Sequence, residues 1–463
     1  MQVVMDLVIR NGIVVTSGGR TLADIGIEGG RVTQLGGPMV GREELDAAGR
    51  FVLPGGIDVH VHLTPAGSTP QSWRWVDDFD HGSAAALAGG VTTIGNMSHP
   101  DLRETMVDAV ARDTADGLRS SRCDFILHPI LMDPSPAEID SIASLAAAGH
   151  TSIKIFLSFR RFDRSVAAYL DALRRIAAVG SLAMLHCEDI GIIDCCCQML
   201  RDDGHTHASY YAQSRPVAAE RAATERAVAF GEITGCPIYV VHLASGAALD
   251  SCRAAQARGV PVYVETRPLY LHLTRERFDE PDGAKYAGAP PLRDQVDVDA
   301  LWAAISQGTV STLATDHAPW FLEQKLDPTL DATNLRQGVA ELETSLPMLW
   351  SAGVRTGRIT IERFVEITAT NPAKLFGLYP TKGTIAPGSD ADLMIWDDAD
   401  TRVIDGSTMN SRAGWSPYDG WSVTGWPAAV VSRGEIVARD GCLTELAVPG
   451  RGRLVPRGPH RPL

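Results

Sequence analysis

The sequence predicts an α/β protein in which a (β/α)8 TIM-type barrel is joined to a small β-sandwich domain built from both chain termini. Two patterns in the 463 residues predict this fold. In the middle of the chain, short apolar runs alternate with Ala- and Leu-rich stretches such as residues 138–149 and 167–180. This alternation is typical of parallel strands joined by crossover helices. At both ends, short apolar runs are separated by glycine-containing turns, which is typical of β-hairpins.

These patterns also set the expected domain boundaries. Residues 1–51 and 378–463 carry the hairpin pattern, so we expect them to form the β-sandwich. We expect the inserted residues 52–377 to form the barrel, which typically needs roughly 250 residues. The insertion contains eight candidate strands, and this number favours a closed barrel over an open sheet. The candidates are residues 50–60, 91–97, 123–130, 151–157, 181–187, 236–242, 260–266 and 310–316.

Composition argues against several classes of partner. Hydrophobic residues make up 45% of the chain and charged residues 21%, as in ordinary globular proteins. The 42 basic and 56 acidic residues give a net charge of −14, which argues against nucleic acid and anionic membranes as partners. The first residues lack a basic segment, and Asp6 interrupts their apolar run, so we expect neither a signal peptide nor a membrane span.

Two further features bear on the compartment and on assembly. The chain has eight cysteines, and the consecutive residues Cys195, Cys196 and Cys197 cannot all point at one metal. We therefore expect reduced thiols and a cytoplasmic protein. Residues 449–463 contain four arginines and no acid. We expect this segment to be a solvated tail, or an arm that packs on a neighbouring subunit.

Metal-ligand residue types occur at the ends of the predicted barrel strands. Active sites of such barrels lie at the carboxyl ends of the strands. His60 and His62 are two residues apart, so their side chains share one face of a strand and can bind one cation. The other candidates in or at the ends of strands are Lys154, His186, His242 and Asp316.

Lys154 is unusual because its ammonium would be buried within an apolar strand, which is costly. Carboxylation by CO2 would convert this lysine into an anion (N6-carboxylysine) with two oxygens that can bridge two cations. Imidazole and carboxylate ligands suit Zn2+, and also Mn2+, Fe2+ or Co2+. Two such cations sharing a hydroxide would lower its pKa and polarise a carbonyl. Asp316 would accept the proton from this hydroxide and deliver it to a leaving nitrogen.

Several motifs along nearly the whole chain resemble those of the cyclic amidohydrolases, above all the dihydropyrimidinases and hydantoinases, with allantoinases close behind. They include PGGIDVHVHL, SIKIF, LHCED, YVVHLAS, ATDHAP, NPAKLFGLYPTKGTIAPGSDADLMIWD and SPYDGWSVTGWP. The resemblance implies hydrolytic opening of a cyclic amide, imide or ureide by a homo-oligomer, commonly a homotetramer. It also implies that one cation is held by His60, His62, Lys154 and Asp316. The second cation would be held by Lys154, His186 and His242.

The chain departs from the family pattern at three substrate-contacting positions. Phe159 stands where dihydropyrimidinases have a tyrosine whose hydroxyl stabilises the developing oxyanion, so that donor is lost or moved. Ala289 replaces a serine, as it does in allantoinases. Asn334 matches the family's asparagine, although the residues around it differ. The following segment, GVAELETSLPML, looks more like allantoinase. The resemblance thus implies an intact metal site and an altered pocket.

Three other residues are candidates for supporting roles. Arg160 and Arg161 follow Phe159 directly, and we expect one of them to contact a polar or anionic group of the substrate. The alternative is a solvated basic patch, to which Arg164 would also belong. His317, beside Asp316, is expected to orient that aspartate or to line the pocket.

The sequence leaves alternatives open. Allantoinase remains an alternative activity. Dihydroorotase is disfavoured, because its pattern has an arginine two residues after the second histidine, where this chain has Thr64. A non-catalytic dihydropyrimidinase-like scaffold is disfavoured because all six ligand positions are filled.

Overall fold

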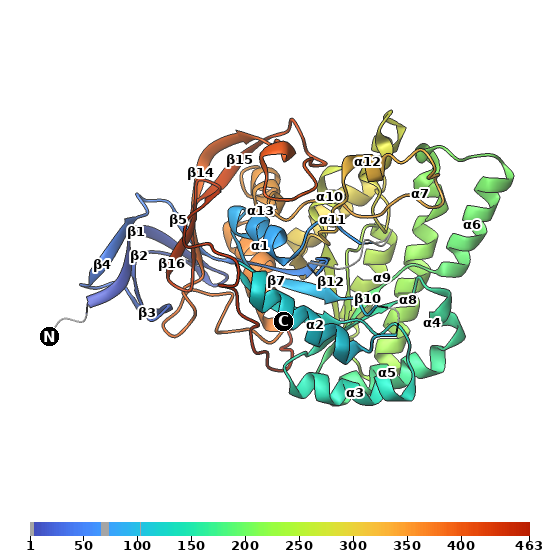
Figure 1. The fold of residues 1–463 in the computed structure, drawn as a ribbon, viewed down its shortest axis with the longest axis horizontal. Coiled ribbons are helices and arrows are strands. Elements are labelled where there is room, and N and C mark those ends of the chain that lie inside the picture. Colours follow the sequence, from blue (N-terminus) through green and yellow to red (C-terminus); the bar gives the residue numbers. More distant parts are fainter. Residues whose placement is uncertain (1–3, 66–73, 102) are drawn as a thin grey trace.

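The computed structural model describes residues 4–65, 74–101 and 103–463, and it contains a barrel and a β-sheet domain (Figure 1). The barrel comprises eight strands that follow one another around its wall. They are β6 (Gly56–Val61), β7 (Val91–Ser98), β8 (Asp124–Pro129), β9 (Ser152–Phe156), β10 (Leu182–His186), β11 (Ile238–Val240), β12 (Val262–Thr266) and β13 (Thr312–Leu313). The predicted fold class is therefore confirmed, and each predicted strand overlaps an observed one.

Parallel pairing closes the barrel. β6, β7 and β8 form one ladder, and β9 to β13 form a second. Two parallel bridges join the ladders, one between Ile130 and Lys154 and one between Val61 and His317. The backbone amide of His62 donates to the carbonyl of His317 at 2.8 Å. The bridges between the two ladders thus bring together the strand ends that carry the predicted site.

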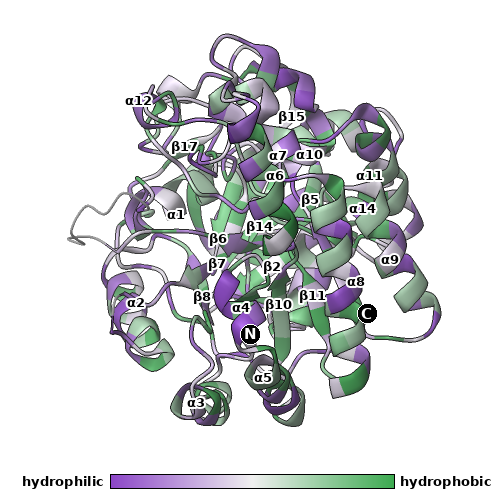
Figure 2. Cartoon of the chain, turned by 90° about the vertical axis from the view of Figure 1, so that its right-hand side faces the viewer, coloured by the Kyte–Doolittle hydropathy of each residue, from purple (hydrophilic) through white to green (hydrophobic). Residues whose placement is uncertain are grey.

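Helices surround the barrel and cover its strands. The longer ones are α1 (Phe79–Ala88), α2 (Met106–Ser120), α3 (Pro136–Ala147), α5 (Val166–Ala178), α6 (Ile190–Asp202), α8 (Val217–Thr234), α9 (Gly246–Ala257) and α11 (Gln295–Gln307). The shorter ones are α4 (Arg160–Arg164), α7 (Tyr211–Ser214), α10 (Pro268–His272), α12 (Leu322–Lys325), α13 (Ser345–Leu349), α14 (Ile361–Val365) and α15 (Asn371–Leu375). Strands at the barrel centre are mostly hydrophobic, whereas surrounding helices such as α2 carry hydrophilic residues (Figure 2). No helix in the described ranges is long and apolar enough to span a membrane.

Both chain ends build the β domain, as predicted. Its nine strands are hydrogen-bonded into one sheet in the order β17-β16-β15-β14-β5-β1-β2-β3, with β4 paired to β1. They bury a common apolar core to which Ile9, Ile25 and Val431 belong. The strands are β1 (Val4–Thr16), β2 (Gly19–Glu28), β3 (Arg31–Leu35), β4 (Val40–Asp46), β5 (Phe51–Pro54), β14 (Leu393–Val403), β15 (Ser422–Ser432), β16 (Glu435–Arg439) and β17 (Cys442–Leu443).

The passage from sheet to barrel differs from the expectation. We expected one strand over residues 50–60, but the structure divides it at Gly55 into β5, which pairs with β1 and β14, and β6. A Cβ atom on Gly55 would lie only 2.3 Å from Thr92 Oγ1, so a glycine is required for this close approach to β7. The expected start of the barrel at residue 52 therefore falls within a strand of the β domain.

The C-terminal segment is not a solvated tail, and it packs on the barrel of its own chain. The amide of Phe125 donates to the carbonyl of Arg453, and the amide of Val455 donates to the carbonyl of Phe125, both at 2.9 Å. Arg457 is buried and donates to Ser152 Oγ and to the carbonyls of Leu127 and Gly149. The basic composition suggested exposure. Backbone pairing and these acceptors instead hold the segment against the barrel and bury Gly452 and Arg457, while residues 461–463 are exposed.

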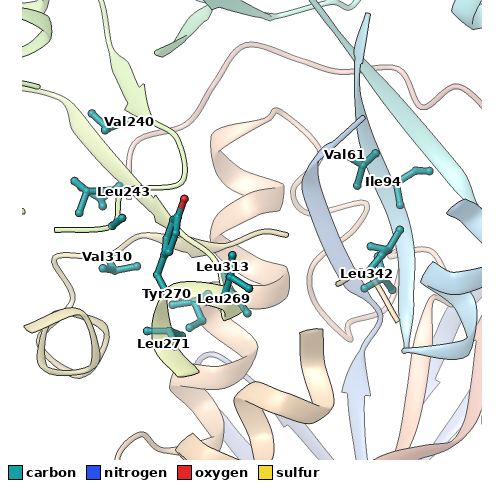
Figure 3. Close-up of a cluster of buried hydrophobic side chains, with 14 of the residues drawn as sticks. Val61, Ile94, Val240, Leu243, Leu269, Tyr270, Leu271, Val310, Leu313 and Leu342 are labelled. Atoms are coloured by element: carbon teal, nitrogen blue, oxygen red, sulfur yellow. The ribbon is translucent and has the colours of Figure 1, made fainter. Parts of the chain in front are cut away.

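Apolar clusters fix the connections between strands and helices. Leu269, Tyr270 and Leu271 of α10 lie together with Val310 and Leu313 (Figure 3). On the other side of the same view, Leu342 lies near Val61 and Ile94 of β6 and β7 (Figure 3). These contacts anchor the loops that follow β12 and β13.

Candidate metal centre

The six predicted ligand residues converge at the carboxyl end of the barrel. His60 and Lys154 lie within β6 and β9, and His186 ends β10. His62, His242 and Asp316 come one to three residues after their strands. All six are buried; Asp316 is the most exposed, at 8%.

Three of these residues form a compact group. His62 Nε2 lies 2.9 Å from Asp316 Oδ1, and His60 Nε2 lies 3.3 Å from the same oxygen. One ligand atom from each of the three residues falls within 4.8 Å of the others, which is compatible with one shared cation. Lys154 Nζ lies 3.5 Å from His60 Nε2, at the edge of this group.

A second pair lies beside the first group. His186 Nδ1 is 3.0 Å from His242 Nε2, and the His60 and His242 rings are stacked with centroids 5.4 Å apart. The backbone of His242 has φ of +37° and that of Asp316 has φ of +50°. Few residues other than glycine adopt this left-handed region, and Asp and His are among those that adopt it most readily.

Carboxylates that sequence reasoning missed hold the imidazoles. Glu265 Oε1 lies 2.8 Å from His60 Nδ1 and accepts the backbone amide of His242 at 2.7 Å. Glu188 Oε2 lies 2.8 Å from His186 Nε2, and Glu188 also accepts from Arg215. Such partners orient ligand histidines and fix their tautomers. The available signal was their position, since Glu188 and Glu265 follow or end apolar runs.

Sequence reasoning also missed Arg267, which contacts the oxygen of Asp316 that does not face the histidines. Arg267 Nη1 donates to Asp316 Oδ2 at 2.9 Å, and Arg267 Nε donates to Glu341 Oε2 at 2.8 Å. The hydroxyl of Tyr418 donates to Glu341 Oε1. Arg267, Glu341 and Tyr418 are all fully buried.

Burial dominates the protonation of the site. It lowers the pKa of Lys154 to about 8, although the charges of Asp316 and Glu265 act against this. Burial also lowers the pKa of His60 and of His242 well below the ordinary value, which favours the neutral imidazoles that metals require. Burial acts to raise the pKa of Asp316, but electrostatic interactions with His60 and Arg267 hold it well below its usual range.

A cavity of about 930 Å³ opens onto this group. Five of the six candidate ligands line it, and so do the predicted contact residues Phe159, Ala289 and Asn334. The Phe156 ring packs on those of Phe159 and His186, with centroids 5.0 and 5.5 Å away. Further aromatic residues in the lining are Trp75, His99 and Trp320.

The two arginines expected to contact the substrate lie in different places. Arg161 lines the cavity and donates to the carbonyl of Met132 at 2.8 Å. Arg160 is not among the residues found to line it, and its Nε lies 2.7 Å from Asp194 Oδ2 on an exposed surface. The expectation that Arg160 contacts the substrate therefore has no support in the geometry.

The ring of His317 does not contact Asp316, and His317 is not among the residues found to line the cavity. The ring bonds Asp77, at 2.9 Å, and accepts the backbone amides of Glu341 and Leu342 on its Nδ1. Arg267 contacts Asp316 instead. The carbonyl of His317 accepts the backbone amide of His62 at 2.8 Å, so a supporting role for His317 stays a prediction.

The donor set fits divalent cations. Four buried imidazoles and one carboxylate are ligands that Zn2+, Mn2+, Fe2+ and Co2+ accept. Their ligand atoms lie close together, with His62 Nε2 at 2.9 Å from Asp316 Oδ1 and His242 Nε2 at 3.0 Å from His186 Nδ1. The far nitrogens of His60 and His186 contact Glu265 and Glu188, as is usual for ligand histidines.

Residues 51–437 match the model of the amidohydrolase family. The chain belongs to this family. It is 37% identical over 462 residues to a D-hydantoinase of Ralstonia pickettii, with 99% of this chain and 100% of that protein covered. It is also 37% identical over 470 residues to a D-phenylhydantoinase of Escherichia coli O1:K1 / APEC, with 99% of each covered.

A solved D-hydantoinase structure superimposes with a TM-score of 0.93 at 36% identity, covering 99% of this chain and 100% of that one. The predicted resemblance to cyclic amidohydrolases of the hydantoinase branch is thereby confirmed. The protein is a hydrolase that acts on cyclic amides.

Proposed function

We propose that the protein opens the C–N amide bond of hydantoins and related cyclic amides with two divalent cations. The observation that carries this proposal is the convergence of six buried ligand residues on one cavity in a chain that resembles D-hydantoinases over its whole length. His60, His62, Lys154 and Asp316 would hold one cation. Lys154, His186 and His242 would hold the other. When bound, such cations make water nucleophilic at neutral pH and polarise the scissile carbonyl.

We also propose that Lys154 is carboxylated. Its amine is fully buried, and no carboxylate in the described structure lies within salt-bridge distance of it. Addition of the neutral amine to CO2 forms an N–C bond and releases a proton, which leaves a carbamate with two anionic oxygens. This change replaces a costly buried cation with a bridging ligand. Incubation with 13CO2 should give a carbamate signal in the 13C NMR spectrum that Lys154→Met lacks; identical spectra would contradict the carboxylation.

Asp316 is the proposed proton carrier. Its Oδ1 faces His60 and His62, while its Oδ2 is held by Arg267. A carboxylate in this position can take the proton from the attacking water and deliver it to the ring nitrogen as the C–N bond breaks. Asp316 lines the cavity, so a bound ring can reach it.

The cavity suits a ring with an aromatic substituent. Phe156, Phe159, Trp75 and Trp320 give it apolar walls, and the cavity is large for a bare hydantoin ring. The name of the D-phenylhydantoinase relative agrees with this preference. Arg161 at the cavity wall would contact a polar group of the substrate. The positions of Ala289 and Asn334 suit contacts with the reacting ring.

The proposal is tested by a ring-opening assay on metal-loaded protein. The panel contains hydantoin, 5-phenylhydantoin, dihydrouracil, allantoin, dihydroorotate and succinimide, with Asp316→Asn as the control. We expect the highest kcat/KM with 5-phenylhydantoin. Highest turnover of allantoin would favour the allantoinase alternative, for which Ala289 in the cavity wall is the supporting observation. No turnover of any ring would refute the proposal.

Assembly and compartment follow from the resemblance and from the cysteines. We propose a homotetramer, as is common among the enzymes that the chain resembles; sedimentation equilibrium tests this. The eight cysteines are free thiols, of which Cys195 and Cys442 are exposed, and this agrees with the reducing conditions of the cytoplasm.

A further inference from the structure

Asp316 is the first member of a buried chain of four polar side chains. Arg267 Nη1 donates to Asp316 Oδ2 at 2.9 Å, and Arg267 Nε donates to Glu341 Oε2 at 2.8 Å. The Tyr418 hydroxyl donates to the remaining oxygen, Glu341 Oε1. Every member is at least 92% buried, so the contacts are shielded from solvent and strong.

The three residues behind Asp316 come from separate, well-anchored segments. Arg267 directly precedes α10, which Leu269, Tyr270 and Leu271 fix to the apolar cluster (Figure 3). Glu341 directly precedes Leu342, which packs near β6 and β7 in the same view. Tyr418 lies in the C-terminal part of the chain, shortly before β15. The chain of contacts therefore links the segment before β15 to the catalytic cavity.

The charges explain why both partners of Arg267 are present. A buried guanidinium needs compensation, and Glu341 supplies one full negative charge through two hydrogen bonds. Arg267 therefore donates a single hydrogen bond to Asp316, and this contact is not bidentate. Only Oδ1 of Asp316 is left to face His60 and His62.

We propose that Arg267, held by Glu341 and Tyr418, is the positioning residue that fixes the orientation of the Asp316 carboxylate. This inference rests on the proposed roles of Asp316 as ligand and proton carrier. The backbone of Asp316 has φ of +50°, an uncommon conformation that the surrounding structure must hold in place. The guanidinium of Arg267 fixes the plane of the Asp316 carboxylate through Oδ2, the oxygen that does not face the histidines. A displacement of about 1 Å in such a group costs on the order of 100-fold in rate.

The test compares four variants with the wild-type holoenzyme. Arg267→Met removes the contact, Arg267→Lys keeps a cation, and Glu341→Gln and Tyr418→Phe loosen the arginine. Tyr286→Phe is the control, because it also removes a tyrosine hydroxyl that donates to a glutamate, Glu280, in a partly buried hydrogen bond outside the cavity. The readouts are kcat, KM, cations per chain and the rate at which a chelator removes them.

We expect Arg267→Met to lower kcat by about 100-fold and Tyr418→Phe by about 5-fold, with KM changed less than about 2-fold. Arg267→Lys should recover part of kcat. Chelation of Arg267→Met should release one cation at least about tenfold faster than from the wild type, since a misoriented Asp316 binds it less well. The Tyr286→Phe control should match the wild type in every readout.

Two results would overturn the inference. One is a folded Arg267→Met protein whose kcat and cation release both match the wild type. The other is equal losses in Tyr418→Phe and Tyr286→Phe, which would indicate a general packing effect. If the wild type opens no ring but Arg267→Met still releases a cation faster, the proposed function fails and the positioning role stands.

Discussion

Both ends of the barrel bury charged side chains, but they satisfy these charges in different ways. At the amino end, Lys382 is paired with Asp124, Asp390 and Asp392, and Arg457 donates to a hydroxyl and two carbonyls. At the carboxyl end, Lys154 has no carboxylate at salt-bridge distance in the described structure. The buried charges of Lys382 and Arg457 at the amino end are thus satisfied by intramolecular contacts. The carboxyl end needs a ligand to be complete, which is the property that distinguishes a functional site from a structural one.

The largest expected effect concerns the carboxyl end. Asp316→Asn removes the proton carrier but keeps the shape of the side chain, so kcat/KM should fall by about 1,000-fold or more. The metal-free protein should unfold at about the same temperature as the wild type. A loss below about tenfold would mean that another group carries the proton.

The two buried lysines give the most direct contrast between the ends. Lys382→Met removes the cation that three neighbouring acids share. Asp124 keeps Arg433, but the buried Asp392 is left without a basic side chain in the described structure, so the free energy of unfolding should fall by about 3–5 kcal/mol. Lys154→Met removes an unpaired buried cation, so the metal-free protein should be no less stable, while metal content and activity are lost. Denaturant titration and elemental analysis measure both. Equal destabilisation by the two variants would contradict the proposed difference between the two ends of the barrel.

Glu343 offers a pH-dependent comparison outside the metal centre. Burial raises its pKa from the ordinary 4.5 to about 7, although Asn410 donates to it through its backbone and side chain. Between pH 4.5 and 7 the folded protein binds more protons than the unfolded chain, so stability falls as pH rises. Relative to Glu343→Gln, the wild type should lose about 3 kcal/mol across this interval. Parallel stability curves for the two proteins would contradict the shift.

The smallest expected effect is at the cavity's outer surface. Arg160→Ala breaks an exposed ion pair with Asp194, so stability should change by less than about 0.5 kcal/mol and kcat/KM should not change. Arg161→Ala, which alters the cavity wall, is the comparison. A large loss of kcat/KM in Arg160→Ala would restore this residue as a substrate contact.

Residue patterns predicted the barrel, the two-ended β domain and the positions of the six candidate ligands. They succeeded because strand burial and the metal-ligand residue types leave local signals. The break at Gly55 was missed, because only the approach of Thr92 from β7 requires it. Burial of Arg457 was missed because its acceptors come from residues some 300 positions away in the sequence.

The residues that support the ligands were missed for the same reason. Arg267 and Glu341 are 74 residues apart, and only the fold brings them into hydrogen-bond contact. His317 was expected to orient Asp316 or to line the pocket because of its place beside Asp316, but its ring bonds Asp77. The positions of residues at the ends of predicted strands thus indicated which groups meet at the site. The contacts between individual side chains depend on side-chain directions, which the sequence does not show.

The number of cations in the purified wild-type protein tests the central claim most directly. Elemental analysis of protein that was prepared with added zinc and CO2 and freed of unbound metal should give two cations per chain. A value near zero under these conditions would contradict the account, because the unpaired groups at the carboxyl end would then be a structural feature and not a catalytic metal centre.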